Sequence, residues 1–253
     1  MLGWDPRRVR NAVREWSLVR HERKEFLQQK SQRDSIADFP VASNYFVFGE
    51  RSADAGEASG HYFHQDLLVA REIFERQPER HVDVGSRVDG FVAHVASFRS
   101  IDVIDVRPLA DIEGIRFIQA DVMNLDPSLE GMADSVSCLH ALEHFGLGRY
   151  GDPINYDGWR LGLTSLTRML KNEGVLYLSV PTGSQQRVEF NAHRVFSLPF
   201  LRDVLEKDFT VERCAFVADD GSLLPNIYPH SEEAEKSFSA VYGCSIWVLR
   251  KKA

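Results

Sequence analysis

HVDVGSRVDGF, residues 81–91, is the segment of the sequence that is most informative about the fold. It begins as a short apolar strand that runs into an acidic residue and a glycine, a pattern typical of turns that bind nucleotides. Such turns commonly continue with a second and a third glycine, whereas this one has Arg87 and Asp89, and Gly90 comes one position late. Glycine admits positive φ angles and a close approach of ligand to backbone. Two hypotheses therefore stay open: a ligand site with unusual residues, or a strand end that only resembles one.

Apolar strands alternate with helices on both sides of this stretch. The pattern predicts strands at 81–85, 101–106, 114–120, 133–140, 175–181, 210–217 and 244–250, and helices at 5–30, 64–77, 89–98, 156–174 and 200–209. This alternation implies an α/β protein with a mostly parallel sheet that helices cover on both faces. No long helix separates the last two strands, which is compatible with an antiparallel pair at one edge.

The predicted helices at 64–77 and 156–174 each have a clear apolar side. In the helix at 64–77 the residues expected to be buried are Leu67, Leu68, Ala70, Ile73 and Phe74. In the helix at 156–174 they are Trp159, Leu163, Leu166 and Leu170. Gly174 is expected to cap the second helix, and Pro181 to end the strand that follows.

Composition limits the function classes. The chain has 253 residues, enough for one large α/β domain or a domain with an appendage, and a net charge of −7, which disfavours general nucleic-acid binding. No apolar run is long enough for a membrane span, and residues 1–16 are not expected to be a secretory signal, because no apolar stretch follows their basic residues. The three cysteines, Cys138, Cys214 and Cys244, lie far apart in apolar runs. They are therefore interpreted as reduced core residues of a cytoplasmic protein.

The N-terminal region differs from the rest. Residues 1–60 are expected to form a helical and loop-rich extension, and residues 61–253 the α/β domain. Residues 1–34 hold nine Lys or Arg against five Asp or Glu. The helix is either a solvated helix with one packed stripe or a basic arm that docks on a partner or an anionic membrane surface.

Polar residues follow the predicted strands where each strand ends. Asp83 and Gly85 follow the first strand, Asp105 the second and Asp121 the third, and HALEH (140–144) follows the fourth. Ligands bind at this edge of parallel sheets. Asp105 stands 22 residues after Asp83, near the spacing of a carboxylate that accepts both ribose hydroxyls.

The order VDVG, VIDVRP, IQADVMNL, ADSVSCLHALEH, GVLYLSVP and NAHRVFSLPFLRDVL resembles the class I S-adenosylmethionine-dependent methyltransferases over residues 78–250. This resemblance implies a doubly wound, seven-stranded, Rossmann-like sheet with an antiparallel terminal strand pair. It also implies S-adenosyl-L-methionine as cofactor, with Asp105 on the ribose and Asp121 and Val122 at the adenine. The full set of cofactor-binding residues expected on this basis is Asp83, Gly85, Ser86, Arg87, Asp105, Asp121, Val122 and His140.

Two further segments, GLGRYGDP and FNAHRVFS, resemble a smaller family within this fold. That family is an uncharacterised domain of unknown function. The resemblance implies a mostly bacterial family that is commonly associated with polysaccharide biosynthesis.

Two segments match the motifs of other chemistry letter for letter, but their context does not support either function. GLGRYG (146–151) matches a dinucleotide-binding pattern, but no strand precedes it directly, and Asp152 and Pro153 follow at once. HALEH matches a zinc-protease pattern, which requires a stable helix and a third ligand. A glycine-rich loop at the rim of the site is the preferred interpretation of the first match.

Candidate catalytic residues lie past the fourth and fifth strands. His144 is the first candidate for a general base, with Glu143 beside it and His193 able to flank the same pocket. The candidates for substrate binding are His64, Arg149, Tyr150, Asn191 and Arg194.

The sequence therefore predicts a methyltransferase that acts on a small molecule or glycan, with O-methylation of a sugar favoured and no metal expected. The first alternative is a non-catalytic binding or scaffold protein on the same fold, which the altered glycine turn favours and Asp105 and Asp121 oppose. The second is a zinc hydrolase that uses His140, Glu143 and His144.

Overall fold

The computed structural model describes residues 6–32, 41, 45–48, 51 and 55–253, and divides the chain into two units, Met1–Glu57 and Ala58–Ala253. The first unit contains helix α1 (Pro6–Ser31), where the sequence predicts a helix. Within this unit the ring of Trp16 packs edge-on against Phe46, with 5.2 Å between the ring centroids. No helix among the described residues is both long and apolar enough to cross a membrane.

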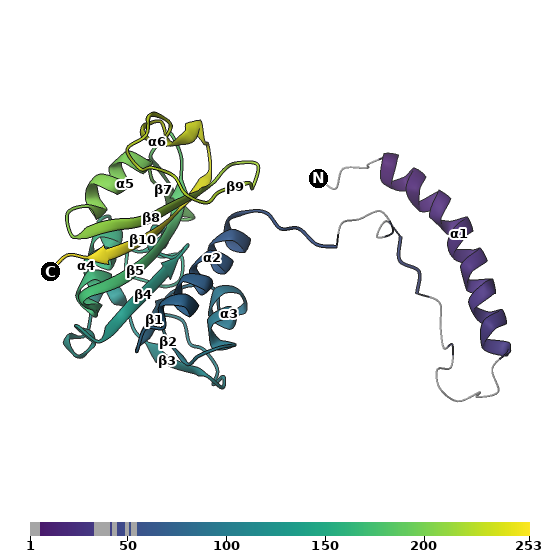
Figure 1. Ribbon diagram of the computed structural model, residues 1–253, viewed down its shortest axis with the longest axis horizontal. Coiled ribbons are helices and arrows are strands. Elements are labelled where there is room, and N and C mark those ends of the chain that lie inside the picture. The colour runs from purple at the N-terminus through teal and green to yellow at the C-terminus, as the bar shows by residue number, and fades with distance from the viewer. Residues whose placement is uncertain (1–5, 33–40, 42–44, 49–50, 52–54) are drawn as a thin grey trace. The chain divides into compact units, whose positions relative to one another are not determined.

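The second unit is built on an eight-stranded sheet of order β3-β2-β1-β4-β5-β10-β8-β9 (Figure 1). Strands β1 to β5 pair in parallel, and β10 pairs antiparallel with both β5 and β8. This is the mostly parallel sheet with antiparallel terminal strands that the sequence predicts, with the two-residue strand β9 added at the edge. In chain order the strands are β1 (His81–Val84), β2 (Ile101–Asp105), β3 (Ile115–Gln119), β4 (Ala133–Leu139), β5 (Leu170–Thr182), β8 (Phe209–Val217), β9 (Leu223–Leu224) and β10 (Gly243–Lys251).

Helices cover both faces of the sheet. Alternate residues of each strand point to opposite sides, so the sheet has two apolar faces, and each face packs against its own helices. On β10, Trp247 belongs to one core cluster and Ile246 to the other. The cluster with Trp247 includes residues of α4 (Gly158–Met169) and α5 (Leu198–Leu205), and the cluster with Ile246 includes residues of α2 (His61–Arg76) and the short α3 (Ala93–Ala96). The remaining elements are the hairpin β6 (Arg187–Glu189) with β7 (His193–Val195), and the helix α6 (Glu232–Glu235).

The junction of α4 and β5 differs from the prediction. The helix ends at Met169, and Leu170 is already extended and pairs with Ala133 of β4. Gly174 therefore lies inside the strand instead of capping a helix. Pro181 does not end the strand either, because it pairs with Cys244 of β10 and extended backbone suits the φ angle that proline prefers.

Helix α2 also presents a different face from the one expected. Leu67 and Phe74 are 46% and 56% exposed, whereas Val69 is fully buried. The polar residue Gln65 is buried as well, and its side-chain oxygen accepts a 2.6 Å hydrogen bond from the Ser179 hydroxyl of β5. This hydrogen bond satisfies a buried polar pair, so the helix turns its polar residues toward the sheet at this point.

His81 is a buried histidine at the start of β1. Its two ring nitrogens lie 2.8 Å and 3.1 Å from the hydroxyl oxygens of Ser135 and Ser137. Burial lowers the pKa of His81 from 6.5 to about 3, so the folded protein holds a neutral imidazole.

We expect this histidine to make the protein sensitive to acid. The unfolded chain binds a proton at His81 below pH 6.5, whereas the folded chain does so only near pH 3, so the free energy of unfolding falls as the pH is lowered through that window. The slope from this residue is at most about 1.4 kcal/mol per pH unit. Urea denaturation of the wild type and of His81→Gln across this range measures it. If the free energies of unfolding of the wild type and of His81→Gln differed by the same amount at every pH in this range, the buried neutral state would be contradicted.

Candidate functional site

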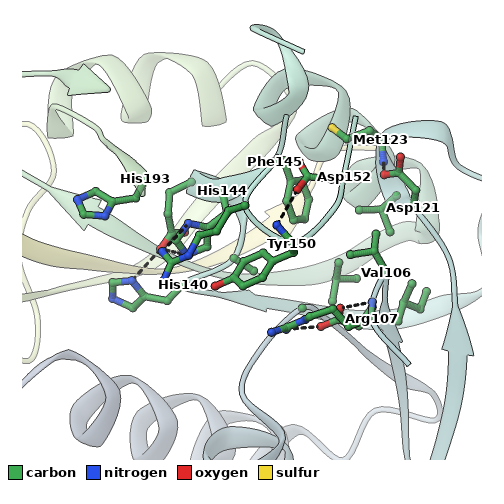
Figure 2. Close-up of a pocket in the computed structure, with 18 of the residues that line it drawn as sticks. Val106, Arg107, Asp121, Met123, His140, His144, Phe145, Tyr150, Asp152 and His193 are labelled. Carbon is green, nitrogen blue, oxygen red and sulfur yellow. Dashed lines mark hydrogen bonds and ion pairs between the residues drawn. The ribbon is translucent and has the colours of Figure 1, made fainter. Parts of the chain in front are cut away.

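A cavity of about 420 Å³ opens at the carboxyl ends of β1, β2, β3 and β4 (Figure 2). Its walls combine two groups of residues. One group follows β1, β2 and β3 and includes Gly85, Asp105 and Asp121. The other group follows β4 in the chain and includes His140, Glu143, His144, Arg149 and Tyr150. It is completed by three residues from distant segments, Tyr62, His193 and Tyr242.

The turn after β1 is held from beneath by Asp83. Its carboxylate is fully buried and accepts hydrogen bonds from the hydroxyl groups of Ser86 and Ser137, each at 2.6 Å. Burial raises the pKa of Asp83 to about 6. Neither Asp83 nor Ser86 lines the cavity, and the hydrogen bonds between them hold the turn in place. Gly85 does line it, at a φ of 71° that favours glycine.

Of the residues that replace the usual glycines, Arg87 is extended and precedes a short helical turn (Val88–Val92) that contains Asp89 and is kinked at Gly90. Arg87 points outward and pairs with Asp89 at 2.9 Å, and its guanidinium carbon lies 5.1 Å from the centre of the Tyr62 ring. Gly90 has its own packing reason, since a Cβ there would lie 2.8 Å from a carboxylate oxygen of Asp66. Arg87 also lines the cavity, but its charge is already paired.

Asp105 ends β2 at the cavity wall, as predicted, but it has a partner that the sequence analysis missed. Arg107 donates from Nε to one carboxylate oxygen at 3.0 Å and from Nη2 to the other at 2.7 Å. The Arg107 guanidinium also lies 4.4 Å from the centre of the Tyr150 ring. Each carboxylate oxygen of Asp105 therefore already accepts one hydrogen bond from the arginine side chain. The sequence signal for this partner was the arginine in the segment VRP, which directly follows Asp105.

Asp121 keeps one carboxylate oxygen accessible to a ligand. Oδ1 accepts from the backbone N–H of Met123 at 2.9 Å, as the N-cap of a 3₁₀ turn (Val122–Asn124). Asp121, Val122 and Met123 all line the cavity. The second oxygen, Oδ2, can accept from a ligand amino group.

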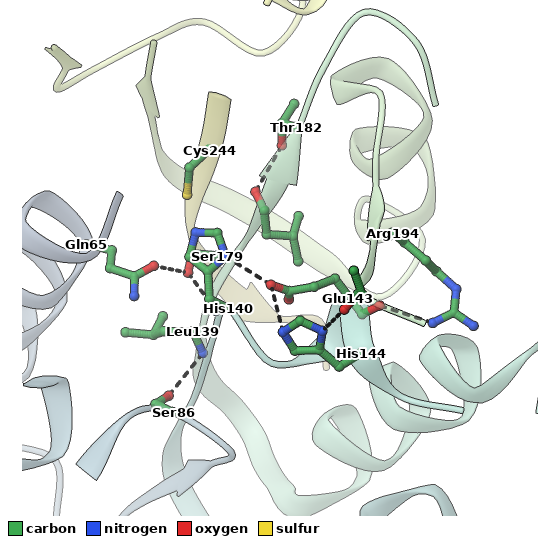
Figure 3. A network of polar contacts seen from close by, with 12 residues as sticks. Gln65, Ser86, Leu139, His140, Glu143, His144, Ser179, Thr182, Arg194 and Cys244 are labelled. Atoms are coloured by element: carbon green, nitrogen blue, oxygen red, sulfur yellow. Dashed lines mark hydrogen bonds and ion pairs between the residues drawn. The ribbon is translucent and has the colours of Figure 1, made fainter. Parts of the chain in front are cut away.

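Glu143 lies between two histidines in the buried part of the site (Figure 3). Its Oε1 is 2.9 Å from Nδ1 of His140 and 3.6 Å from Nε2 of His144. Burial opposes ionisation of Glu143, but the charge and hydrogen bond of His140 hold its pKa below the ordinary value. Burial likewise opposes a charge on His140, yet Cys244 and Glu143 raise the pKa of His140 well above 6.5.

His144 has the geometry of a neutral base. Its Nδ1 lies 2.7 Å from the carbonyl oxygen of Ala192, which can only accept, so Nδ1 carries the proton. The other ring nitrogen, Nε2, is then unprotonated. Burial lowers the pKa of His144 below 6.5, which favours this neutral form near pH 7.

The predicted substrate-binding residues divide into two groups. Arg149 and Tyr150 line the cavity, and Tyr150 lies between His144 and Arg107 (Figure 2). The other three do not line it: His64 contacts the carbonyl oxygen of Gly221, Asn191 follows β6, and Arg194 is buried. His193, predicted as catalytic, does line the cavity and pairs with Glu189 at 3.2 Å.

The two literal motif matches form other structures. In GLGRYG the carboxylate of Asp152 accepts from the backbone N–H groups of Gly146 and Gly148, so the loop binds its own anion. In HALEH the segment Leu142–His144 is a 3₁₀ turn, and both histidines face Glu143 instead of sharing one face of a helix. The geometry therefore supports neither a dinucleotide site nor a zinc-protease helix.

A family model matches residues 112–203, less than half of the chain, and is described as a "Caenorhabditis protein of unknown function, DUF268". The match spans HALEH, GLGRYGDP and FNAHRVFS and is consistent with the expected resemblance to a family of unknown function. That the family is mostly bacterial stays a prediction, since its model is named for Caenorhabditis. No curated protein matches the sequence.

Solved structures show the fold. The 1,6-didemethyltoxoflavin-N1-methyltransferase of Burkholderia thailandensis, bound to S-adenosylhomocysteine, is 17% identical and has a TM-score of 0.52 over 79% of this chain and 94% of its own. The N-methyltransferase NodS of Bradyrhizobium japonicum, also with S-adenosylhomocysteine, is 12% identical and has a TM-score of 0.50 over 75% of this chain and 86% of its own. The [4+2]-cyclase SpnF is 14% identical and has a TM-score of 0.51 over 74% of this chain and 82% of its own. The α/β domain therefore has the Rossmann-like methyltransferase fold.

Arg194 is expected to support the site without binding substrate. It donates to the carbonyl oxygens of Glu143, Phe145 and Tyr156 at 3.2, 2.7 and 3.1 Å. Arg194→Ala should lower the free energy of unfolding by about 2–4 kcal/mol, because these carbonyls lose a charged donor. Arg149→Ala, at the exposed rim, should change it by less than about 1 kcal/mol. Urea denaturation compares them, and equal stability of the two variants would argue against the clamp.

Proposed function

We propose that this protein is an S-adenosylmethionine-dependent methyltransferase for a small hydroxyl-bearing acceptor. The observation that carries the proposal is the pair of carboxylates, Asp105 and Asp121, at the ends of β2 and β3 on the wall of one cavity. Parallel sheets bind ligands at this edge. The methyltransferases with the same fold that hold S-adenosylhomocysteine support the choice of cofactor.

The residues present fit this cofactor. Asp105 accepts from the two ribose hydroxyls once Arg107, whose side chain is 48% exposed, swings away from the carboxylate. Oδ2 of Asp121 accepts from the adenine amino group, with Val122 beside the ring. Gly85 lets the backbone approach the methionine part, and its added Cβ would already touch Ala141 at 3.0 Å. The bound cofactor supplies an activated methyl group.

The acceptor lies between His144 and His193 in this proposal. Nε2 of His144 takes the proton of the acceptor hydroxyl, and the carboxylate of Glu143, 3.6 Å away, stabilises the imidazolium that forms. Tyr150 and Tyr242 line the same cavity and flank this region. The protein thus holds the nucleophile in line and removes its proton.

A sugar is the favoured acceptor, within polysaccharide biosynthesis in the cytoplasm. A basic site for a hydroxyl group and the flanking rings of Tyr150 and Tyr242 support this choice. The net charge of −7 disfavours a nucleic-acid substrate. Residues 1–60 are proposed as a separate extension whose basic helix docks on a partner or an anionic surface.

A scaffold protein without catalysis is the second candidate. Two observations favour it: the glycine-poor turn after β1, and the ion pair of Arg107 that covers both oxygens of Asp105. The cyclase SpnF also has this fold, so the fold alone does not fix the reaction. Cofactor binding distinguishes the two candidates.

We expect calorimetric titration with S-adenosylmethionine to give micromolar binding by the wild type. Asp105→Asn should weaken binding at least about tenfold, because a charged acceptor for two hydroxyls is lost. Arg107→Ala should strengthen it by about five- to tenfold, since the variant removes a competing bidentate ion pair whose carboxylate is only 14% exposed. The exposed Asp126→Asn serves as control. A wild type that binds no cofactor at millimolar concentration would favour the scaffold.

The role of His144 is tested with cofactor labelled in its methyl group and a panel of monosaccharides and nucleotide sugars. For the acceptor found, His144→Gln should lower kcat by about 10²–10⁴ with cofactor affinity unchanged, because only proton removal is lost. The wild-type rate should fall only as the pH drops below 6.5, since the active form is neutral and its pKa is lowered. An unchanged kcat in His144→Gln would place the base elsewhere, and His193→Gln is the matched variant.

A further inference from the structure

Three potential metal ligands meet behind the cavity, although they come from distant parts of the chain. His61 begins α2, His140 follows β4, and Cys244 belongs to β10. One ligand atom from each residue lies within 4.8 Å of the ligand atoms of the other two. Figure 3 shows the ring of His140 between Cys244 and Glu143.

His140 has an unusual polar environment. Nδ1 is 2.9 Å from the Glu143 carboxylate, whereas Nε2 is buried and has no hydrogen-bond partner among the described residues. The residue is only 8% exposed, so solvent does not reach that nitrogen easily. Buried polar atoms are nearly always satisfied by a protein group, a water or an ion. The orphan nitrogen therefore points to a missing ligand.

The two nitrogens of His140 match the pattern of a metal-bound histidine. Such residues donate from one ring nitrogen to a carboxylate and bind the metal with the other. Glu143 supplies that carboxylate and places negative charge beside the cluster. The imidazole of His61 is stacked on His140, with 5.1 Å between ring centroids and 8° between planes. Cys244 is fully buried, its thiol lies 3.7 Å from the carbonyl oxygen of Ser245, and it also interacts with His140.

We propose that His61, His140 and Cys244 bind a zinc ion, with Glu143 orienting His140. Two imidazoles and a thiolate suit this borderline-soft cation, and hard cations such as Mg²⁺ prefer oxygen. Binding requires Cys244 as the thiolate and Nε2 of His140 without a proton, so the protons that these two atoms carry are released to solvent when the ion binds. Three protein ligands leave a fourth position for a water or an acceptor oxygen. His140 lines the cavity, so this position adjoins the proposed acceptor region.

This site differs from the zinc-protease pattern in HALEH. That pattern pairs His140 with His144, but Nδ1 of His144 bonds Ala192 and its other nitrogen faces Glu143. The proposed ion also departs from the expectation of a metal-free protein. It would tie the start of α2, and with it the cavity residue Tyr62, to the sheet.

The test uses the full chain, stripped with a chelator and titrated with Zn²⁺ and with Co²⁺. We expect one ion per chain and, with Co²⁺, a sulfur-to-metal charge-transfer band together with the absorption of a four-coordinate ion. Cys244→Ser and His61→Ala should each weaken binding at least about 100-fold, and Glu143→Gln about 10- to 100-fold. Cys214→Ser, a buried cysteine on the neighbouring strand β8, should leave affinity and spectrum unchanged.

Several outcomes would overturn the site. One is a wild type that binds neither ion at micromolar concentration. Another is a cobalt spectrum without the thiolate band, which needs no variant and so does not depend on Cys244→Ser folding. A third is loss of binding in His144→Gln but not in His61→Ala, which would place the ion on the HALEH pair. Metal binding is measured without cofactor, so its failure is distinct from failure of the proposed methyl transfer.

Discussion

The buried carboxylate of Asp83 is the constraint on which the cavity depends. It accepts from Ser86 in the turn after β1 and from Ser137 in β4, and the Ser86 hydroxyl in turn accepts from the backbone N–H of Leu139. These bonds tie the ends of two neighbouring parallel strands together. An unpartnered buried carboxylate is costly, so the turn cannot open locally without losing stability. The open backbone at Gly85 follows from this anchoring.

Several charged groups at the cavity already have partners within the protein. Arg107 covers Asp105, Asp89 covers Arg87, and Asp152 occupies the glycine loop. The first two pairs involve arginines that are about half exposed, at 48% and 54%. The pair of Arg87 with Asp89 is exposed on both sides, so its exchange costs at most about 1 kcal/mol. Exchange of the Arg107 pair costs more, because the carboxylate of Asp105 is only 14% exposed.

Glu143 divides the buried part of the site between two histidines. His140 precedes the 3₁₀ turn that carries Glu143 and lies beside Cys244 and His61, whereas His144 ends that turn; both histidines line the cavity. A continuous helix would place both histidines on one face instead. One carboxylate can therefore orient a metal ligand on one side and stabilise an imidazolium on the other. The two proposed functions share Glu143 but are measured by different ligands.

The sequence by itself determined the order of strands and helices, and the placement of Asp105 and Asp121 at strand ends, because hydrophobic periodicity and strand termination are local properties. The tertiary structure alone decided which partners the side chains take. Arg107 covers the predicted ribose carboxylate, Arg194 donates to three carbonyl oxygens, and His61 lies beside His140 and Cys244. These contacts join segments whose meeting depends on packing, and no spacing in the sequence encodes it.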